Sequence, residues 1–402
     1  MSESGSRHRN EPPIGRRMAE LRARRGMSQQ VFADRIRRSK SWVDKVERGV
    51  RTLDRLSVIE TVAGALGVAP DVLLAGNATR ESVADTGGDV DQVRAALARY
   101  DLPGLGSVDR PTPSLVELDS QAGYAWTAYR HGHHPQVLRL LPGLLADSRH
   151  LCHPHPHEAA DLSVRVHRLA AHVLVKLGEG DLAWLAADRA MSAANGDPWR
   201  GSLAAISLAQ ALRTLGQSRL AMTAAMDAVR QIDLARPDPR RTGVAGTLLI
   251  EAALAAAISS DVTAAGELTE RAARLAADAG CHDHDGIAFS ATAVDLARAL
   301  IATWSGDHHL AVLRHRRAIG ANGWHLLPAE HRAAHLIDIA RAHLNLGDTG
   351  AAGQALVNAD RVAPAEMRTR PVAREALTAA LRAGPTAADV ARLAAAVGLT
   401  RR

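Results

Sequence analysis

Aromatic residues and cysteines are scarce in this 402-residue chain. Phe, Trp and Tyr together make up 3% of it, whereas alanine and leucine are abundant, which favours helices over sheets. The two cysteines, Cys152 and Cys281, can build neither a disulfide framework nor a Cys-x-x-Cys metal pair. This cysteine usage predicts a reducing, cytoplasmic setting.

Long apolar runs are absent as well. The longest candidate, Val244 to Ile258, is interrupted by Glu251, so no run of about 18 uncharged apolar residues occurs. Residues 1–13 are polar, end in two prolines and lack the apolar core of a signal peptide. We therefore expect a disordered N-terminal tail over 1–13 and a protein that does not interact with membranes.

Positive charge is concentrated near the N-terminus. Residues 14–55 contain 13 Arg or Lys and 5 Asp or Glu, a balance of +8 in a chain whose net charge is +6. A small basic segment beside a near-neutral remainder is typical of a nucleic-acid-binding module joined to a larger domain. The alternative interpretation is a solvated, arginine-rich helical surface.

The basic segment reads as five short helices within residues 14–75. Apolar residues recur at helical spacing from Ile14 to Arg25, and Ser28 and Ser39 stand where the N-caps of two further helices belong. Asp54 is expected to cap a fourth helix, and Pro70 to open a fifth that ends at Leu74.

The string SQQVFADRIRRSKSWVDKVERG, from Ser28 to Gly49, closely resembles the helix-turn-helix of the XRE (lambda repressor-like) family. The phrases LRARRGMSQ before it and ALGVAPDVLL after it extend the resemblance to about 60 residues. The resemblance implies a DNA-binding domain over 14–75 whose recognition helix, 39–48, enters the major groove. It also implies a homodimer on double-stranded operator DNA, with the two recognition helices about 34 Å apart.

By position in the family pattern, one set of side chains resembles readers of base edges and another resembles contacts to phosphate. Two departures stand out. Arg37-Arg38 replaces the usual glycine and apolar residue of the turn, and Trp42 replaces a small polar residue, so that it either contacts DNA or covers the domain core. The expected base readers are Lys40, Ser41, Trp42, Asp44 and Lys45, and the expected phosphate contacts are Gln29, Arg16, Arg17, Arg48, Arg51 and Arg55.

Residues 76–113 are rich in glycine and proline and are interpreted as a linker. The linker encloses one amphipathic segment, 90–102, in which Val90, Val93 and Leu97 share a helical face. We expect that segment to pack against another part of the protein.

From residue 114 to 402 the sequence reads as successive helices. A phrase containing the end of one helix, a tight turn and an alanine-rich second helix starts at 177, 215, 258, 304 and 346. Helix pairs repeating at such intervals stack into an α-solenoid, with a period longer than the roughly 34 residues of a tetratricopeptide repeat. The alternative is a helical bundle without repeat symmetry.

A solenoid of this kind presents the first helix of each pair on its concave surface, where extended ligands bind. The joined DNA-binding and helical-repeat parts resemble regulators that sense peptides, and the effector is expected to be a peptide or a small molecule. If the first helices are 160–178, 198–216, 243–259, 286–305 and 329–347, polar residues share one stripe. They are Arg165, Arg168, His172, Gln210, Arg213, Glu251, Asp295, Arg298, Asp338, Arg341 and Asn345. Glu251 is distinctive because apolar residues surround it, and a buried carboxylate needs a partner.

Seven of the 19 histidines lie between 131 and 157, a density that could bind metal, but their spacing matches no known ligand set. His331 and His335 have the spacing of a helical zinc pair but lack a glutamate between them. No phosphate loop, nucleophile elbow or dinucleotide fingerprint occurs. We therefore expect no enzyme activity, no cofactor and no metal.

Together these patterns predict an all-α protein, with a five-helix helix-turn-helix domain followed by a tetratricopeptide-like α-solenoid that serves as effector and dimerisation domain. The expected function is sequence-specific transcriptional regulation under the control of a bound ligand or partner. The alternative is a helical-repeat adaptor or receptor that binds a partner protein or peptide, with DNA binding secondary.

Overall fold

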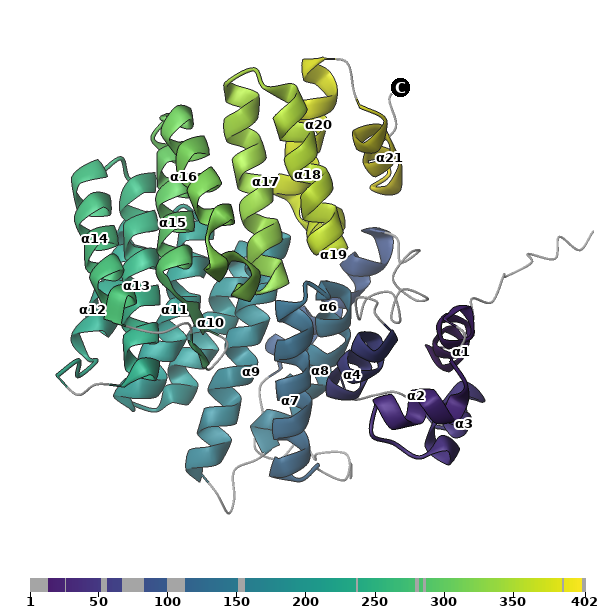
Figure 1. Ribbon diagram of the computed structural model, residues 1–402. Helices are drawn as coiled ribbons and strands as arrows, with labels where there is room; N and C mark the ends of the chain where they lie inside the picture. The colour runs from purple at the N-terminus through teal and green to yellow at the C-terminus, as the bar shows by residue number, and fades with distance from the viewer. Residues whose placement is uncertain are drawn as a thin grey trace, which may run out of the picture. The chain divides into compact units, whose positions relative to one another are not determined.

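A computed structural model of the protein describes residues 14–25, 27–51, 56–66, 83–99, 113–150, 156–235, 238–278, 282–284, 287–384 and 387–399. These residues are almost entirely helical (Figure 1). They belong to two compact units, Met1–Asp85 and Thr86–Arg402. The predicted all-α fold is confirmed, with one short β-ribbon as an addition.

Four short helices make up the described part of the first unit. Ser28 accepts a hydrogen bond from the Val31 amide and Ser39 accepts one from the Trp42 amide, which confirms both predicted N-caps. Phe32 and Val43, both fully buried, fill the space between the second and third helices. The tail 1–13, the cap Asp54 and the expected fifth helix lie outside the described residues. The helices are α1 (Ile14–Arg24), α2 (Gln29–Arg35), α3 (Lys40–Glu47) and α4 (Leu56–Leu66).

The amphipathic segment of the expected linker forms α6, Val83–Leu97, which begins seven residues earlier than the predicted start at 90. The helix continues through Gly87 and Gly88, although each glycine costs about 1 kcal/mol in a helix. Val90, Val93 and Leu97 are buried in one core cluster with the first helices of the second unit. That burial offsets the glycine cost and extends the helix beyond its amphipathic part.

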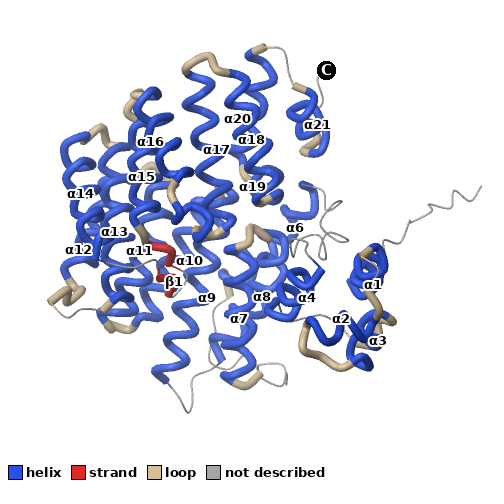
Figure 2. The backbone as a smooth tube through the Cα atoms, in the orientation of Figure 1, coloured by secondary structure: helices blue, strands red, loops and turns tan. Residues whose placement is uncertain are grey.

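Antiparallel helix pairs follow one another through the second unit (Figures 1 and 2). The five pairs predicted from the recurring phrase are α9/α10, α11/α12, α13/α14, α15/α16 and α17/α18, and in each the two helices pack against each other. The helices are α7 (Leu115–Arg130), α8 (His134–His150), α9 (Pro156–Leu177), α10 (Gly180–Ala194), α11 (Pro198–Thr214), α12 (Ser218–Arg230), α13 (Pro239–Ile258), α14 (Val262–Asp278), α15 (Ala291–Trp304), α16 (His308–Gly320), the 3₁₀ helix η1 (Asn322–Leu326), α17 (Ala329–Asn345), α18 (Thr349–Val362), α19 (Pro364–Thr369), α20 (Pro371–Ala383) and α21 (Ala388–Ala396).

The turns between paired helices share one backbone conformation. Gly178, Gly216, Gly306 and Gly347 have φ between 74° and 81°, in the left-handed region that ends many helices. Ser260 occupies the same place in the α13–α14 turn with φ 62°. Left-handed φ is easy for glycine and strained for serine, so this turn is the exception among the five.

The first helices of the pairs pack against one another and form an inner layer, from α7 through α9, α11, α13 and α15 to α17. The layer then returns to its start, because α17 also contacts α7, and α19 contacts both α8 and α9. This return distinguishes the unit from an open array, in which each repeat contacts only its neighbours. It places the residues of the first and last repeats around a common interior.

A two-stranded antiparallel ribbon, red in Figure 2, precedes α15. It consists of β1 (His282–His284) and β2 (Ile287–Phe289), with His282 opposite Phe289. The helix predicted over 286–305 therefore begins later, at Ala291, where Ser290 accepts from the Ala293 amide. The ring of Phe289 is buried against Gly246 of α13, where a Cβ atom would meet it at 2.1 Å, and this packing fixes the ribbon.

The apolar helix α13 would be long enough to cross a membrane. Of its most apolar window, however, 67% is buried inside the protein. It packs between α12, α14 and the neighbouring inner helices, as a central helix of the repeat core does.

Candidate functional site

The face of α3 that carries the expected base readers is open to solvent. Lys40, Ser41 and Lys45 are exposed, while Trp42 and Asp44 are half-buried. Val43 and Val46 on the opposite face are buried against the domain core. A helix of this size with two exposed lysines fits the major groove, where acceptors on guanine suit lysine donors.

Trp42 and Asp44 each contact another side chain of the same region. The guanidinium of Arg38 lies over the Trp42 ring, 5.6 Å from its centroid. Asp44 forms an ion pair with Arg48, with 2.7 Å between Oδ2 and Nη2. Arg48, which was expected to contact phosphate, thus binds Asp44, which was expected to contact a base.

A partly buried set of contacts that the sequence reasoning missed holds α3 in place. Arg22 on α1 donates from Nε and Nη2 to the two carboxylate oxygens of Glu47, at 2.6 and 3.0 Å. Gln29 on α2 donates to the same carboxylate at 2.8 Å. Bidentate arginine–carboxylate pairs are strong and directional, so α1, α2 and α3 are fixed to one another through Glu47. Gln29, which was expected to contact phosphate, therefore also connects α2 to α3 through Glu47.

Of the other expected phosphate contacts, Arg16, Arg48 and Arg51 are exposed. The side chain of Arg17 and all of Arg55 lie outside the described residues. The turn before α3 places Arg37 in the left-handed region, with φ 52°. Arginine thus adopts the conformation for which this turn usually has glycine, at a cost of about 1 kcal/mol.

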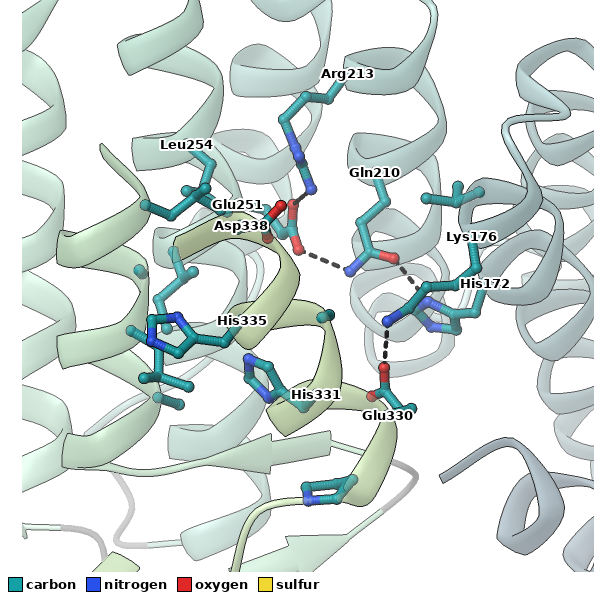
Figure 3. Close-up of a pocket in the computed structure, with 18 of the residues that line it drawn as sticks. His172, Lys176, Gln210, Arg213, Glu251, Leu254, Glu330, His331, His335 and Asp338 are labelled. Atoms are coloured by element: carbon teal, nitrogen blue, oxygen red, sulfur yellow. Dashed lines mark hydrogen bonds and ion pairs between the residues drawn. The ribbon is translucent and has the colours of Figure 1, made fainter. Parts of the chain in front are cut away.

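A cavity of about 450 Å³ occupies the interior of the second unit (Figure 3). Its lining comes from α7, α9, α11, α13, α15 and α17, the inner helices, together with Ile287 and Ala288 of the ribbon and Arg370 and Pro371 near the C-terminus. Its volume lies in the range of small-molecule and cofactor sites. Its concave lining is therefore the candidate ligand-binding surface.

The structure brings together seven of the eleven expected effector residues at this cavity. The other four do not line it. On α15, Leu296, Leu300 and Trp304 face the cavity. The two charged candidates on that helix, Asp295 and Arg298, form ion pairs on another face. The seven are Arg168, His172, Gln210, Arg213, Glu251, Asp338 and Arg341; the four are Arg165, Asp295, Arg298 and Asn345.

Four of the seven form a continuous relay across α9, α11 and α13 (Figure 3). The amide of Gln210 donates to Glu251 Oε1 at 2.7 Å, and Arg213 donates to Oε2 at 3.1 Å. Because the Gln210 nitrogen is used in this way, its oxygen accepts from His172 Nδ1, at 2.7 Å. The partner that buried Glu251 was expected to need is thus supplied by neighbouring inner helices.

His172 is neutral in this relay. Burial is the main cause that lowers its pKa to about 3, and the positive charge of Arg168 lowers it further. Its Nδ1 carries the proton that Gln210 accepts, which leaves Nε2 facing the Ser207 hydroxyl at 3.4 Å. The relay therefore pairs Arg213 with Glu251, and His172 adds no positive charge to it.

A second buried charge cluster, also missed from the sequence, joins the first repeats to the last. Lys176 on α9 lies 2.5 Å from Glu330 of α17 and 3.0 Å from Glu366 of α19. Glu366 is fully buried and also contacts His134 and Arg370, at 3.3 and 3.4 Å. Lysine is rare in this arginine-rich chain, and that rarity was the signal that could have singled out Lys176.

The pKa shifts of Lys176 and Glu366 keep these two groups charged. Burial lowers the pKa of Lys176, but Glu330 and Glu366 outweigh burial and raise it above its ordinary value. Burial raises the pKa of Glu366, but Lys176, followed by His134 and Arg370, lowers it well below its usual range. Lys176 and Glu366 thus form an ionised pair at neutral pH, which connects α9 to α19.

The cavity face of α17 differs from the relay because its polar groups do not bind one another. Burial lowers the pKa of His331 and raises that of Asp338. His335 contacts His315 through ring nitrogens 2.9 Å apart, and its pKa is lowered by burial. The imidazoles of His331 and His335 and the carboxyl group of Asp338 all line the cavity (Figure 3).

Metal ligands do not gather in the parts of the chain that the structure describes, where no three His, Cys, Asp or Glu side chains could hold one ion. His331 and His335, considered above as a helical pair, line the cavity without a third ligand of that kind. Residues 151–155 of the histidine-rich segment lie outside the described residues.

Comparison with protein-family models identifies residues 13–75 as a helix-turn-helix domain. This match confirms the motif recognised between Ser28 and Gly49. No curated protein matches the chain.

Among solved structures, the chain is similar to Bacillus thuringiensis PlcR in complex with the peptide PapR7 and DNA, with 10% sequence identity and a TM-score of 0.36. The matched region covers 75% of this chain and 93% of the PlcR chain. ComR from S. thermophilus, in complex with DNA and its signalling peptide ComS, is 13% identical, with a TM-score of 0.31, covering 87% and 99%.

Proposed function

We propose that this protein is a sequence-specific, DNA-binding transcriptional regulator whose activity is controlled by a ligand in the cavity of its helical-repeat unit. The observation that carries the proposal is the solvent-exposed polar face of α3 within a region that matches a helix-turn-helix domain. Lys40, Ser41 and Lys45 on that face supply donors for base edges.

Charge supports the DNA-binding part of the proposal. The +8 balance of residues 14–55 provides the attraction to phosphates that gives helix-turn-helix proteins most of their non-specific affinity. Exposed Arg16, Arg48 and Arg51 are the proposed phosphate contacts, and they orient the unit without reading sequence. Two such units in a homodimer would read half-sites about 34 Å apart.

The cavity supports the regulatory part. It is enclosed by the inner helices of successive repeats. Lys176 connects α9, near the start of these repeats, to α17 and α19, near their end. A ligand that binds one arrangement of these repeats more tightly than another shifts the population toward that arrangement. The proposed consequence is a change in the separation or mobility of the two DNA-binding units of the dimer.

The test is fluorescence anisotropy of the full-length protein with DNA from its own upstream region and with scrambled DNA of equal length, at several salt concentrations. We expect preferential binding to the native fragment and a steep loss of affinity as salt rises, because phosphate contacts release counterions. Equal, weak binding to both fragments would mean that the operator lies elsewhere or that specific binding needs an effector, and it would call for genome-wide binding data. Binding to neither at low salt would favour the adaptor interpretation.

A further inference from the structure

Among the acidic residues of the cavity that the structure describes, Asp338 differs in having no ion pair within 4 Å. Glu251 accepts hydrogen bonds from Gln210 and Arg213, and Glu330 binds Lys176. Within the described part of the chain, Asp338 forms neither a hydrogen bond nor an ion pair within 4 Å, although it lines the same cavity (Figure 3).

The surroundings of Asp338 make this absence unfavourable. Burial raises its pKa, and Arg370, Lys176 and Arg341 act on it only from beyond ion-pair distance. Two of these cations are already bound, Lys176 to Glu330 and Arg370 to Glu366. A half-buried carboxylate without an ion pair offers an incoming cation a charge-assisted contact inside the cavity.

Apart from Thr247 and Glu251 of α13, the cavity lining contributed by α13 and α15 is apolar. Ile250 and Leu254 come from α13, and Leu296 and Leu300 from α15. Alanines fill the spaces between them, and Trp304 closes the wall beside Arg213. An aliphatic or aromatic group placed there would bury apolar surface at about 25 cal/mol per Å².

We propose that the cavity binds an amphipathic molecule with a protonated amine, its ammonium group at Asp338 and its apolar body against α13 and α15. This inference rests on the proposed regulatory function, since it assigns a chemistry to the effector. An acid of the same shape would meet Asp338 as a like charge, and an alcohol would leave it without a counter-ion. Asp338 would thus determine specificity for a basic nitrogen.

Three probes that share one apolar body test the proposal: phenylpropylamine, phenylpropanol and phenylpropanoate. Their binding to the full-length protein is measured by saturation-transfer NMR and by quenching of tryptophan fluorescence, since Trp126 and Trp304 line the cavity. We expect the amine to bind roughly tenfold more tightly than the alcohol, as a charge-assisted contact in a partly dry site should. The acid should bind more weakly than either.

Asp338→Asn is the decisive variant, because it keeps the shape of the side chain and removes its charge. It should abolish the preference for the amine and leave binding of the alcohol unchanged. Asp295→Asn on α15 is the matched control, since Asp295 does not line the cavity and the preference should persist. Circular dichroism of both variants shows whether they retain the helical fold.

The proposal is overturned if the amine shows no advantage over the alcohol, if the acid binds most tightly, if Asp338→Asn retains the preference, or if no probe binds at millimolar concentration. DNA binding, measured separately by anisotropy, distinguishes this failure from failure of the proposed function. Intact specific DNA binding with no amine preference would refute the ligand class alone.

Discussion

Lys176 on α9 and Glu330 on α17 are 2.5 Å apart, although they belong to opposite ends of the series of repeats. Their ion pair, extended by buried Glu366, bridges the interior that the inner helices enclose. A charge pair at this place does little for local helix stability and instead holds distant repeats together. It therefore offers a direct test of whether the repeat unit folds as a closed body.

Replacing Lys176 by methionine should lower the free energy of unfolding by about 3 kcal/mol, because Glu330 and Glu366 would remain buried without their shared cation. Urea denaturation followed by circular dichroism measures the change. The double variant Lys176→Met/Glu330→Gln should recover part of the loss, since one of the two stranded charges is gone. Arg219→Met on the exposed surface of α12 is the control. An equal effect of the two single variants would contradict a structural role for the bridge.

Stability should fall as the pH decreases from about 6.5 toward 4. His167, His172 and His315 are buried and neutral, with pKa values lowered by burial to about 4, 3 and 4. Between those values and the unfolded value near 6.5, the unfolded chain binds more protons, so stability rises with pH, by up to about 1.4 kcal/mol per unit for each histidine.

His172→Gln isolates one of these contributions, because glutamine can still donate to Gln210. The difference in unfolding free energy between pH 7 and pH 5 should shrink by about 2 kcal/mol relative to the unsubstituted protein. His309→Gln, at an exposed position of α16, should leave that difference unchanged. The measurement is urea unfolding at each pH. A pH dependence that His172→Gln does not alter would show that other groups cause it.

Ser260→Gly should stabilise the protein by about 0.5–1 kcal/mol. Ser260 has φ 62° at the turn where the other four repeats have glycine, and relief of that strain exceeds the extra entropy that glycine gives the unfolded chain. The neighbouring Ser259→Gly, at φ −80°, gains no such relief and should destabilise. Thermal and urea unfolding of the two variants give opposite signs if left-handed strain is the cause, and the same sign if it is not.

Lys45→Ala should weaken binding to specific DNA by about 1–3 kcal/mol if Lys45 reads a base edge. Lys45 is exposed in the last turn of α3, and its removal leaves the buried face of that helix intact. Arg51→Ala should instead weaken binding to native and scrambled DNA alike, as the loss of a phosphate contact does. Anisotropy titrations with both DNAs measure this. Unchanged discrimination by Lys45→Ala would refute its assignment as a base reader.

The helical character of the protein and the position of its turns follow from local features of the sequence. Ser28 and Ser39 cap α2 and α3 because their hydroxyls satisfy local backbone amides, and the glycines at 178, 216, 306 and 347 end helices because they tolerate left-handed φ. Such effects operate within a few residues of the chain. The recurring turn phrase therefore located the helix pairs and, with them, the inner helices that carry the cavity.

Which side chains face the cavity depends on the packing of the helices against one another. Helical spacing places Asp295 and Arg298 together on one face of α15, but the packing of α15 against α13 and α17 turns its apolar face inward. Lys176, Glu330 and Glu366 carry no local signal of their meeting, because contact between distant repeats depends on how every intervening helix pair is rotated. The partners of Glu251 follow from the same packing, as does the lack of an ion pair for Asp338 within the described part of the chain.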